Sequence, residues 1–81
     1  MATKSQHAAR YRAIPELLRA MREEAGLTQR ALGVALGKPQ SWIYNCEAFN
    51  RRVDVAEFCV WCEACGVEPT AAVRRYVAML P

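Results

Sequence analysis

This 81-residue chain has few of the features that mark membrane, secreted or catalytic proteins. It has no run of about 18 apolar residues, and residues 1–6 are polar, so we expect neither a membrane span nor a secretion signal. Its one histidine is His7, and it contains neither a Gly-rich phosphate loop nor a clustered carboxylate pair. We therefore expect no enzyme, no catalytic residue and no cofactor, and a cytoplasmic location.

The composition describes one small folded domain. Apolar residues make up 53% of the chain, which permits one modest core. A domain of this size buries only about 60% of its unfolded surface, so self-association would be a natural source of further stability. The net charge of +3 permits nucleic-acid binding without demonstrating it. The basic side chains lie mostly in the first two-thirds, before a cluster of acidic residues formed by Asp54, Glu57, Glu63 and Glu68.

Residues 27–47 predict two short helices joined by a tight turn. Thr28 suits an N-cap, and apolar residues recur behind it at helical spacing. Gly37 can supply the left-handed residue that ends this helix, and Lys38-Pro39 cannot continue it. Pro39 also suits the start of a second helix. The apolar residues of the two predicted helices are Ala31, Leu32, Ala35 and Leu36 in the first, and Trp42, Ile43 and Cys46 in the second.

The outward positions of the second helix are polar but uncharged: Gln40, Ser41, Tyr44 and Asn45. Amides can pair bidentately with adenine, a hydroxyl can donate or accept, and an aromatic ring can contact a thymine methyl. These residues are therefore candidate readers of base edges in the major groove. A polar surface with no partner is the alternative.

Three more helices complete the expected all-α bundle of about five helices. We place the start of the main first helix at Pro15, with Leu17, Leu18, Met21 and Ala25 facing inward and Gly26 ending it. Residues 1–13 would be a frayed tail or short extra helix, from which Lys4 could reach DNA. A domain of residues 14–81 would then follow.

Asp54 would cap a fourth helix over residues 55–65, ended by Gly66, with Val55, Phe58, Cys59, Cys62 and Cys65 at core spacings. A fifth helix over residues 69–80 carries an apolar stripe of Val73, Tyr76, Val77 and Leu80. This stripe would either complete a two-fold homodimer interface or pack onto the fourth helix.

The sequence around Cys59, Cys62 and Cys65 contains two overlapping Cys-x-x-Cys pairs. This spacing invites a zinc or thiol-sensing interpretation. A structural zinc site normally has four ligands, however, and only Cys46 or His7 could supply the fourth. Free cysteines in a core behave as small hydrophobic residues, so we expect reduced thiols in the core and no metal.

The segment from Gly26 to Gln29 reads Gly-Leu-Thr-Gln, and Leu32, Gly37, Ile43 and Glu47 follow it, with Leu18-Arg19 and Arg22 before it. This pattern resembles the phage-repressor and Cro helix-turn-helix family, often called Xre-type, over about residues 14–69. The resemblance implies a DNA-binding regulator in which Arg22 and Glu47 form a semi-buried ion pair. The alternative is two independent surface charges.

The resemblance also places the loop after Glu47 beside the DNA backbone. Gln29, Lys38, Arg51 and Arg52 would then contact phosphates, with Gln29 also bracing the recognition helix. A solvated basic turn is the alternative for Arg51 and Arg52. The family usually has a glycine soon after the Glu, where Phe49 stands here, so we expect Asn50 to supply the left-handed residue.

Together these features predict a cytoplasmic, nucleoid-associated regulator of prokaryotic or phage origin that binds double-stranded DNA as a homodimer. Its recognition helices would face an inverted repeat, about 34–36 Å apart. Three other roles remain: an antitoxin whose C-terminal helix binds a toxin protein, an interaction module without DNA binding, and a thiol or metal sensor.

Overall fold

The computed structural model describes the backbone of residues 4–81 and the side chains from residue 8 onward. In this part of the chain the structure is all-α, as predicted, and has no strand. The five helices are α1 (Lys4–Glu24), α2 (Gln29–Leu36), α3 (Gln40–Glu47), α4 (Val55–Ala64) and α5 (Pro69–Met79). The side chains of Lys4, the expected DNA-binding arm, and of His7 lie outside the described part of the chain.

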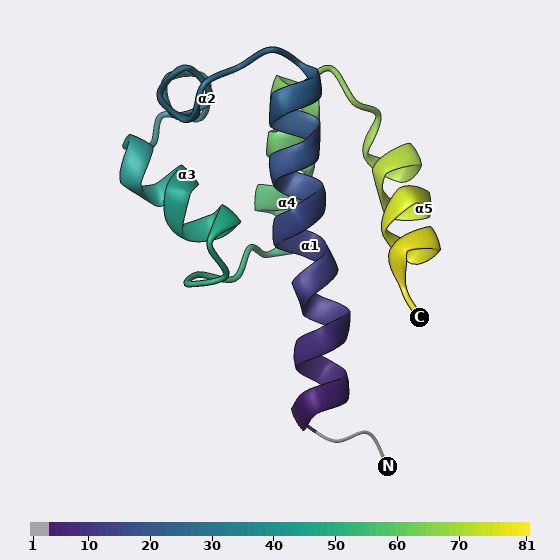
Figure 1. Ribbon diagram of the computed structural model, residues 1–81. Coiled ribbons are helices and arrows are strands. Elements are labelled where there is room, and N and C mark those ends of the chain that lie inside the picture. Colours follow the sequence, from purple (N-terminus) through teal and green to yellow (C-terminus); the bar gives the residue numbers. More distant parts are fainter. Residues whose placement is uncertain (1–3) are drawn as a thin grey trace.

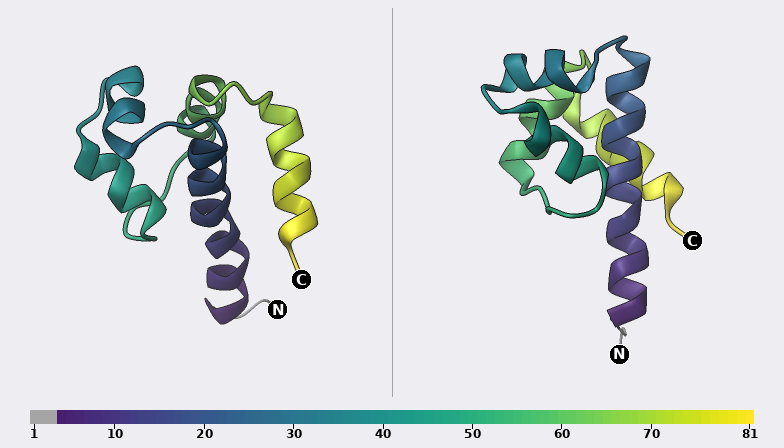
Figure 2. Two further views of the ribbon diagram at one scale, coloured as in Figure 1. Left: turned by 45° about the horizontal axis from the view of Figure 1, so that its top comes forward. Right: turned by 60° about the vertical axis from the view of Figure 1, so that its left-hand side comes forward.

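Helix α1 is the central strut of the bundle. The α2–α3 pair lies on one side of it, α5 lies on the other, and α4 lies behind it in the view of Figure 1. The left view of Figure 2 keeps this order, and in its right view α5 crosses behind α1. Helix α4 also contacts α2 and α5, so it closes the bundle behind α1. The α2–α3 pair is therefore held at the edge of the molecule, with its outer surface open.

The expected start of the first helix at Pro15 is wrong, because α1 runs unbroken through this residue. Proline lacks a backbone N–H, so the carbonyl of Tyr11 loses its helical partner. Tertiary contacts hold the segment before the proline in helical form. The Tyr76 hydroxyl donates to the carbonyl of Arg10 at 3.1 Å, and the Tyr11 hydroxyl accepts from the Val53 N–H at 2.9 Å.

Local chemistry sets the ends of the other helices much as the sequence indicates. The Thr28 hydroxyl accepts from the Ala31 N–H at 3.0 Å and caps α2. Gly37 ends α2 in the left-handed region, with φ of 67°. Asp54 caps α4 through a reciprocal capping box with Glu57.

Gly33 sets how closely α2 approaches the turn before α3. It is buried, and its carbonyl accepts from the Lys38 N–H at 2.8 Å. A Cβ atom at this position would lie 2.6 Å from the Lys38 carbonyl oxygen. Only glycine therefore allows this turn to close without a shift of the backbone.

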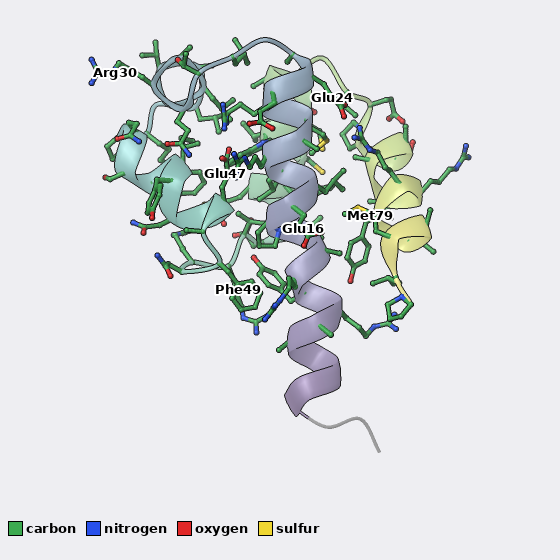
Figure 3. All side chains as sticks on the ribbon, viewed as in Figure 1. Glu16, Glu24, Arg30, Glu47, Phe49 and Met79 are labelled. Atoms are coloured by element: carbon green, nitrogen blue, oxygen red, sulfur yellow. The ribbon has the colours of Figure 1, made fainter. Side chains whose placement is uncertain are left out.

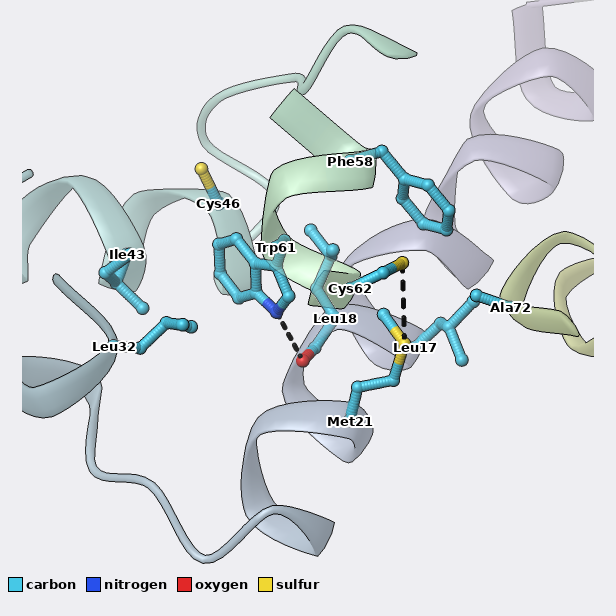
Figure 4. Packing of buried hydrophobic residues seen from close by; sticks show 10 residues of the cluster. All are labelled: Leu17, Leu18, Met21, Leu32, Ile43, Cys46, Phe58, Trp61, Cys62 and Ala72. Atoms are coloured by element: carbon cyan, nitrogen blue, oxygen red, sulfur yellow. Dashed lines mark hydrogen bonds between the residues drawn. The ribbon is translucent and has the colours of Figure 1, made fainter. Parts of the chain in front are cut away.

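The core takes residues from all five helices and is built around the indole of Trp61 (Figure 4). Trp61 is fully buried, and its Nε1–H donates to the carbonyl of Leu18 at 3.0 Å. The fully buried residues around it include Leu17, Leu18, Met21, Leu32, Ile43, Cys46 and Cys62.

Some residues expected in the core lie elsewhere. Val55, at the start of α4, is 79% exposed, and the central position falls to Trp61 instead. Ala25, Ala31 and Ala35 are also exposed. Helical spacing alone predicted these residues to be inward, but the neighbouring helices cover a narrower strip of each surface.

No helix within residues 4–81 combines the length and the apolar character needed to cross a bilayer.

Candidate nucleic-acid interface

Helix α3 divides its residues between the core and the surface. Ile43 and Cys46 are fully buried and fix the helix against the bundle. Trp42, which we expected to face inward with them, is only half-buried. Of the four predicted base readers, Gln40, Ser41 and Tyr44 are exposed and Asn45 is half-buried. They lie on the part of α3 that the rest of the molecule leaves open.

An ion pair ties α3 to α1. Arg22 donates from Nε to Glu47 Oε2 at 2.6 Å and from Nη2 to Glu47 Oε1 at 3.0 Å, a bidentate arrangement. A third guanidinium donor, Nη1, bonds to the Leu27 carbonyl at 2.8 Å. The Arg22 and Glu47 side chains are 11% and 4% exposed. The bond to Glu47 raises the pKa of Arg22, so the guanidinium stays charged. Figure 3 shows Glu47 between α1 and α3.

Two glutamines extend this pair outward to the surface. Gln29 donates from Nε2 to Glu47 Oε1 at 3.1 Å, and Gln40 donates from Nε2 to Gln29 Oε1 at 2.7 Å. The chain of bonds thus runs from the nearly buried carboxylate to the first residue of α3. It fixes the amide of Gln40 before any ligand arrives, while one N–H of this amide and lone pairs on its oxygen remain for a partner.

Asn45 is positioned by the loop that follows α3. Its side-chain oxygen accepts from the Asn50 amide at 3.2 Å, and its backbone carbonyl accepts from the N–H groups of Asn50 and Arg51 at 3.0 and 3.2 Å. The Asn45 amide N–H groups are not used in these bonds, so they are available to a base edge.

The left-handed residue in this loop is Phe49, with φ of 66°, and not Asn50 as expected. The strain of a bulky residue in this region is offset by ring contacts. The Phe49 ring lies 5.5 Å from the Tyr11 ring, and the Arg12 guanidinium lies 5.7 Å from the Phe49 centroid. Figure 3 shows Phe49 beside the N-terminal half of α1. Tertiary packing thus replaces the glycine that the family pattern has near this place.

The cations predicted to contact the DNA backbone lie on both sides of the loop between α3 and α4. Lys38 and Arg51 both lie over the Trp42 ring, at 5.2 and 4.8 Å from its centroid. Arg51 also makes a bidentate bond to Glu57 at 3.1 and 3.2 Å. This bond raises the pKa of Arg51 and lowers that of Glu57. Arg51 is therefore already engaged by an acidic partner, which its sequence neighbours did not indicate.

Arg52 lies on the other side of the loop, with its guanidinium 4.3 Å from the centroid of the Tyr11 ring. Tyr11 belongs to the segment expected to be a tail, and so the sequence reasoning missed it. Arg30 was missed too: it follows Gln29 directly in the first turn of α2 and is exposed (Figure 3). Its position next to Gln29 in the sequence could have indicated a basic side chain beside a predicted backbone contact.

The cysteines behave as parts of the packing. Cys62 is fully buried, 3.9 Å from the Met21 sulfur, and burial raises its pKa to about 11. Burial also raises the pKa of Cys65, although this residue and Cys59 are only half-buried. Among the side chains that the structure describes, no group of three or more potential ligands is arranged to hold a metal ion.

Comparisons with known proteins place this geometry among helix-turn-helix chains. A family model described as a helix-turn-helix domain matches residues 15–75. The chain is 42% identical to an XRE-family like protein from Pseudomonas syringae pv. tomato, with a TM-score of 0.86 over 96% of this chain and 95% of that one. It shares its fold with the clp gene regulator ClgR from C. glutamicum, at 20% identity and a TM-score of 0.76 over 90% and 92% of the two chains. No curated protein matches the chain.

Proposed function

We propose a specific role for this chain from one premise: it belongs to the Xre-type helix-turn-helix family of DNA-binding transcriptional regulators. In this role it binds one preferred duplex sequence as a two-fold dimer. The observation that carries the proposal is the uncharged polar surface of α3, which stands outward and is braced from behind by the bonds through Gln29 to Glu47. Such a role needs no catalytic group.

The base readers in this proposal are Gln40, Ser41, Tyr44 and Asn45. Tyr44 is 52% exposed, so its ring is open to contact a thymine methyl or a base edge. Gln40 and Asn45 each keep free amide groups while a neighbouring amide fixes their orientation. Side chains held before binding lose less conformational entropy on binding, which favours specific contacts.

The backbone contacts in this proposal come from Gln29, Lys38, Arg51 and Arg52. They lie in three segments around α3: the first turn of α2, the turn before α3 and the loop after it. Contacts to phosphates fix the position of a protein on the duplex and carry no sequence information directly. They should therefore affect all sequences alike.

The dimer in this proposal forms through α5. Val73 and Val77 are 49% and 58% exposed, and Met79 is 38% exposed, on a helix at the opposite side of α1 from α3. Beside them lies an apolar cleft of about 270 Å³, lined in part by Ile14, Phe58 and Tyr76. A second copy covering this surface would set the two recognition helices about 34–36 Å apart, on an inverted repeat.

The experiment that tests the proposal is selection of bound duplexes from a random pool. We expect one enriched inverted repeat whose half-sites are about 10 base pairs apart, centre to centre. Enrichment of a single asymmetric site would contradict the dimer, and no enrichment over the starting pool would contradict sequence-specific binding. Sedimentation of the free protein, with Val77→Glu as the variant that should give monomers, tests the α5 interface separately.

Two substitutions separate the readers from the backbone contacts. Asn45→Ala should cost on the order of 1–3 kcal/mol on the selected site and blur preference at one position. Arg52→Ala should weaken the selected site and a scrambled duplex by the same factor. Equal effects of both variants on both duplexes would contradict the division of roles.

The exposed face of α5 also favours a second candidate role, that of an antitoxin-type autoregulator. In this role the same apolar residues bind a toxin protein instead of a second copy of the chain. A chain that sediments as a monomer alone, and that co-purifies in equal amounts with the product of a neighbouring reading frame, would favour this role.

A further inference from the structure

Tyr11 reaches from α1 to the loop between α3 and α4, which we call the α3–α4 loop (residues 48–54), and contacts it at three points. Its hydroxyl accepts from the Val53 N–H at 2.9 Å. Its ring lies 5.5 Å from the ring of Phe49, the left-handed residue of the loop. The guanidinium of Arg52 lies 4.3 Å from its centroid. One side chain thus contacts both ends of the loop and its outer cation.

The three contacts act on different degrees of freedom. The hydrogen bond fixes the backbone at the end of the loop, and the contact between the rings supports the strained backbone at its beginning. The contact with Arg52 is a cation–π interaction, which restricts a long and flexible side chain to positions over the ring. A guanidinium that stacks on a ring by its face keeps its N–H edge free for another partner.

Arg52 differs in this respect from the neighbouring Arg51. Arg51 is bonded to both carboxylate oxygens of Glu57, so its charge is already met within the protein. The Arg52 contact is with a neutral ring. Burial raises the pKa of Tyr11, so the ring stays neutral at working pH. The charge of Arg52 therefore remains available to a phosphate.

We propose that Tyr11 is a positioning residue for DNA binding, which holds the α3–α4 loop and Arg52 ready for a phosphate of the duplex. This inference rests on the proposed function. It assigns a role in binding to the segment of α1 before Pro15, which lies outside the matched residues 15–75. Tyr11 itself makes no contact with DNA in this arrangement.

The test compares two hydroxyl deletions, each of which removes a tertiary hydrogen bond of the α1 segment before Pro15. Tyr11→Phe removes the bond to Val53, whereas Tyr76→Phe removes a bond of the same kind from α5 to the carbonyl of Arg10. Both variants keep their rings. Tyr11→Phe should weaken binding to a mixed-sequence duplex about threefold. In the free protein, Val53 amide exchange should accelerate only in Tyr11→Phe.

Removing the ring tests the link to Arg52. Tyr11→Leu should weaken binding to the same duplex about tenfold and lower the salt slope by about one phosphate contact. In an Arg52→Ala background the same change should cost less than about twofold, because the two residues act through one contact. Equal losses in both backgrounds, or an unchanged salt slope, would overturn the proposal.

The outcomes separate this inference from the proposed function. A wild-type chain that binds no duplex overturns both. Salt-dependent binding by the wild type that Tyr11→Leu does not change, in a variant with native circular dichroism, overturns the role of Tyr11 alone. Selection of a specific site is not needed for either measurement, because phosphate contacts form on any sequence.

Discussion

Replacing Glu47 with glutamine would remove one charge from a nearly buried pair while keeping the shape of the side chain. The Arg22 side chain is only 11% exposed, so its charge would be left largely without compensation. Breaking such a pair from one side costs about 3–5 kcal/mol. The remaining bond from Arg22 to the Leu27 carbonyl supports a value near the lower end. A loss of about 3 kcal/mol in a domain of this size lowers the unfolding midpoint by roughly 12–24 °C.

Urea unfolding followed by circular dichroism measures this loss. The matched control is Glu24→Gln, which removes the same charge from the exposed pair that Glu24 forms with Arg75 and should change the midpoint little. Removing both charges together, as R22M with E47L, should recover much of the stability, because no unpaired charge remains. A Glu47→Gln variant within about 1 kcal/mol of the wild type would refute the reasoning.

Three further outcomes are expected. Glu57→Gln should tighten binding to a mixed-sequence duplex by up to about tenfold in an anisotropy titration, because it releases Arg51 to a phosphate; weaker binding would contradict a backbone role for Arg51. Gly33→Ala should cost about 1–3 kcal/mol in urea unfolding, because its Cβ would lie 2.6 Å from the Lys38 carbonyl oxygen; Ala35→Gly, on the exposed face of the same helix, controls for backbone entropy. Burial raises the pKa of Cys62 from 9.0 to about 11, so the folded state favours the protonated thiol. The contribution of this thiol to the free energy of unfolding is therefore complete below pH 9 and is lost as the pH rises to about 11. Unfolding free energies across this range should show the fall, and Cys62→Ala should show less of it.

Local sequence chemistry predicted the bounds of α2 and α3 closely. The side chains of Thr28 and Asp54 cap their helices as predicted. Gly37, which has no side chain, takes the left-handed conformation that ends α2. Each depends on contacts within about four residues, so the sequence carries the whole signal. The outward set on α3 follows for the same reason, because helical spacing fixes which residues oppose Ile43 and Cys46.

The failures came where distant segments meet. Pro15 predicted a helix boundary, but packing of Tyr11 and Tyr76 retains the helix before it. Asn50 has the better intrinsic preference for the left-handed region, yet Phe49 occupies it because two neighbours from α1 hold its ring. Val55 has an apolar side chain at helical spacing, but no helix covers it.

The sequence by itself determined helices α2 to α5, the caps at Thr28 and Asp54 and the polar surface of α3, because these depend on neighbours along one helix. Only the tertiary structure decided which cations are free, which residue closes the α3–α4 loop and what braces Gln40. Those features join residues 6 to 51 positions apart, such as Arg51 with Glu57 and Glu24 with Arg75, and the chain must fold before either partner can restrict the other.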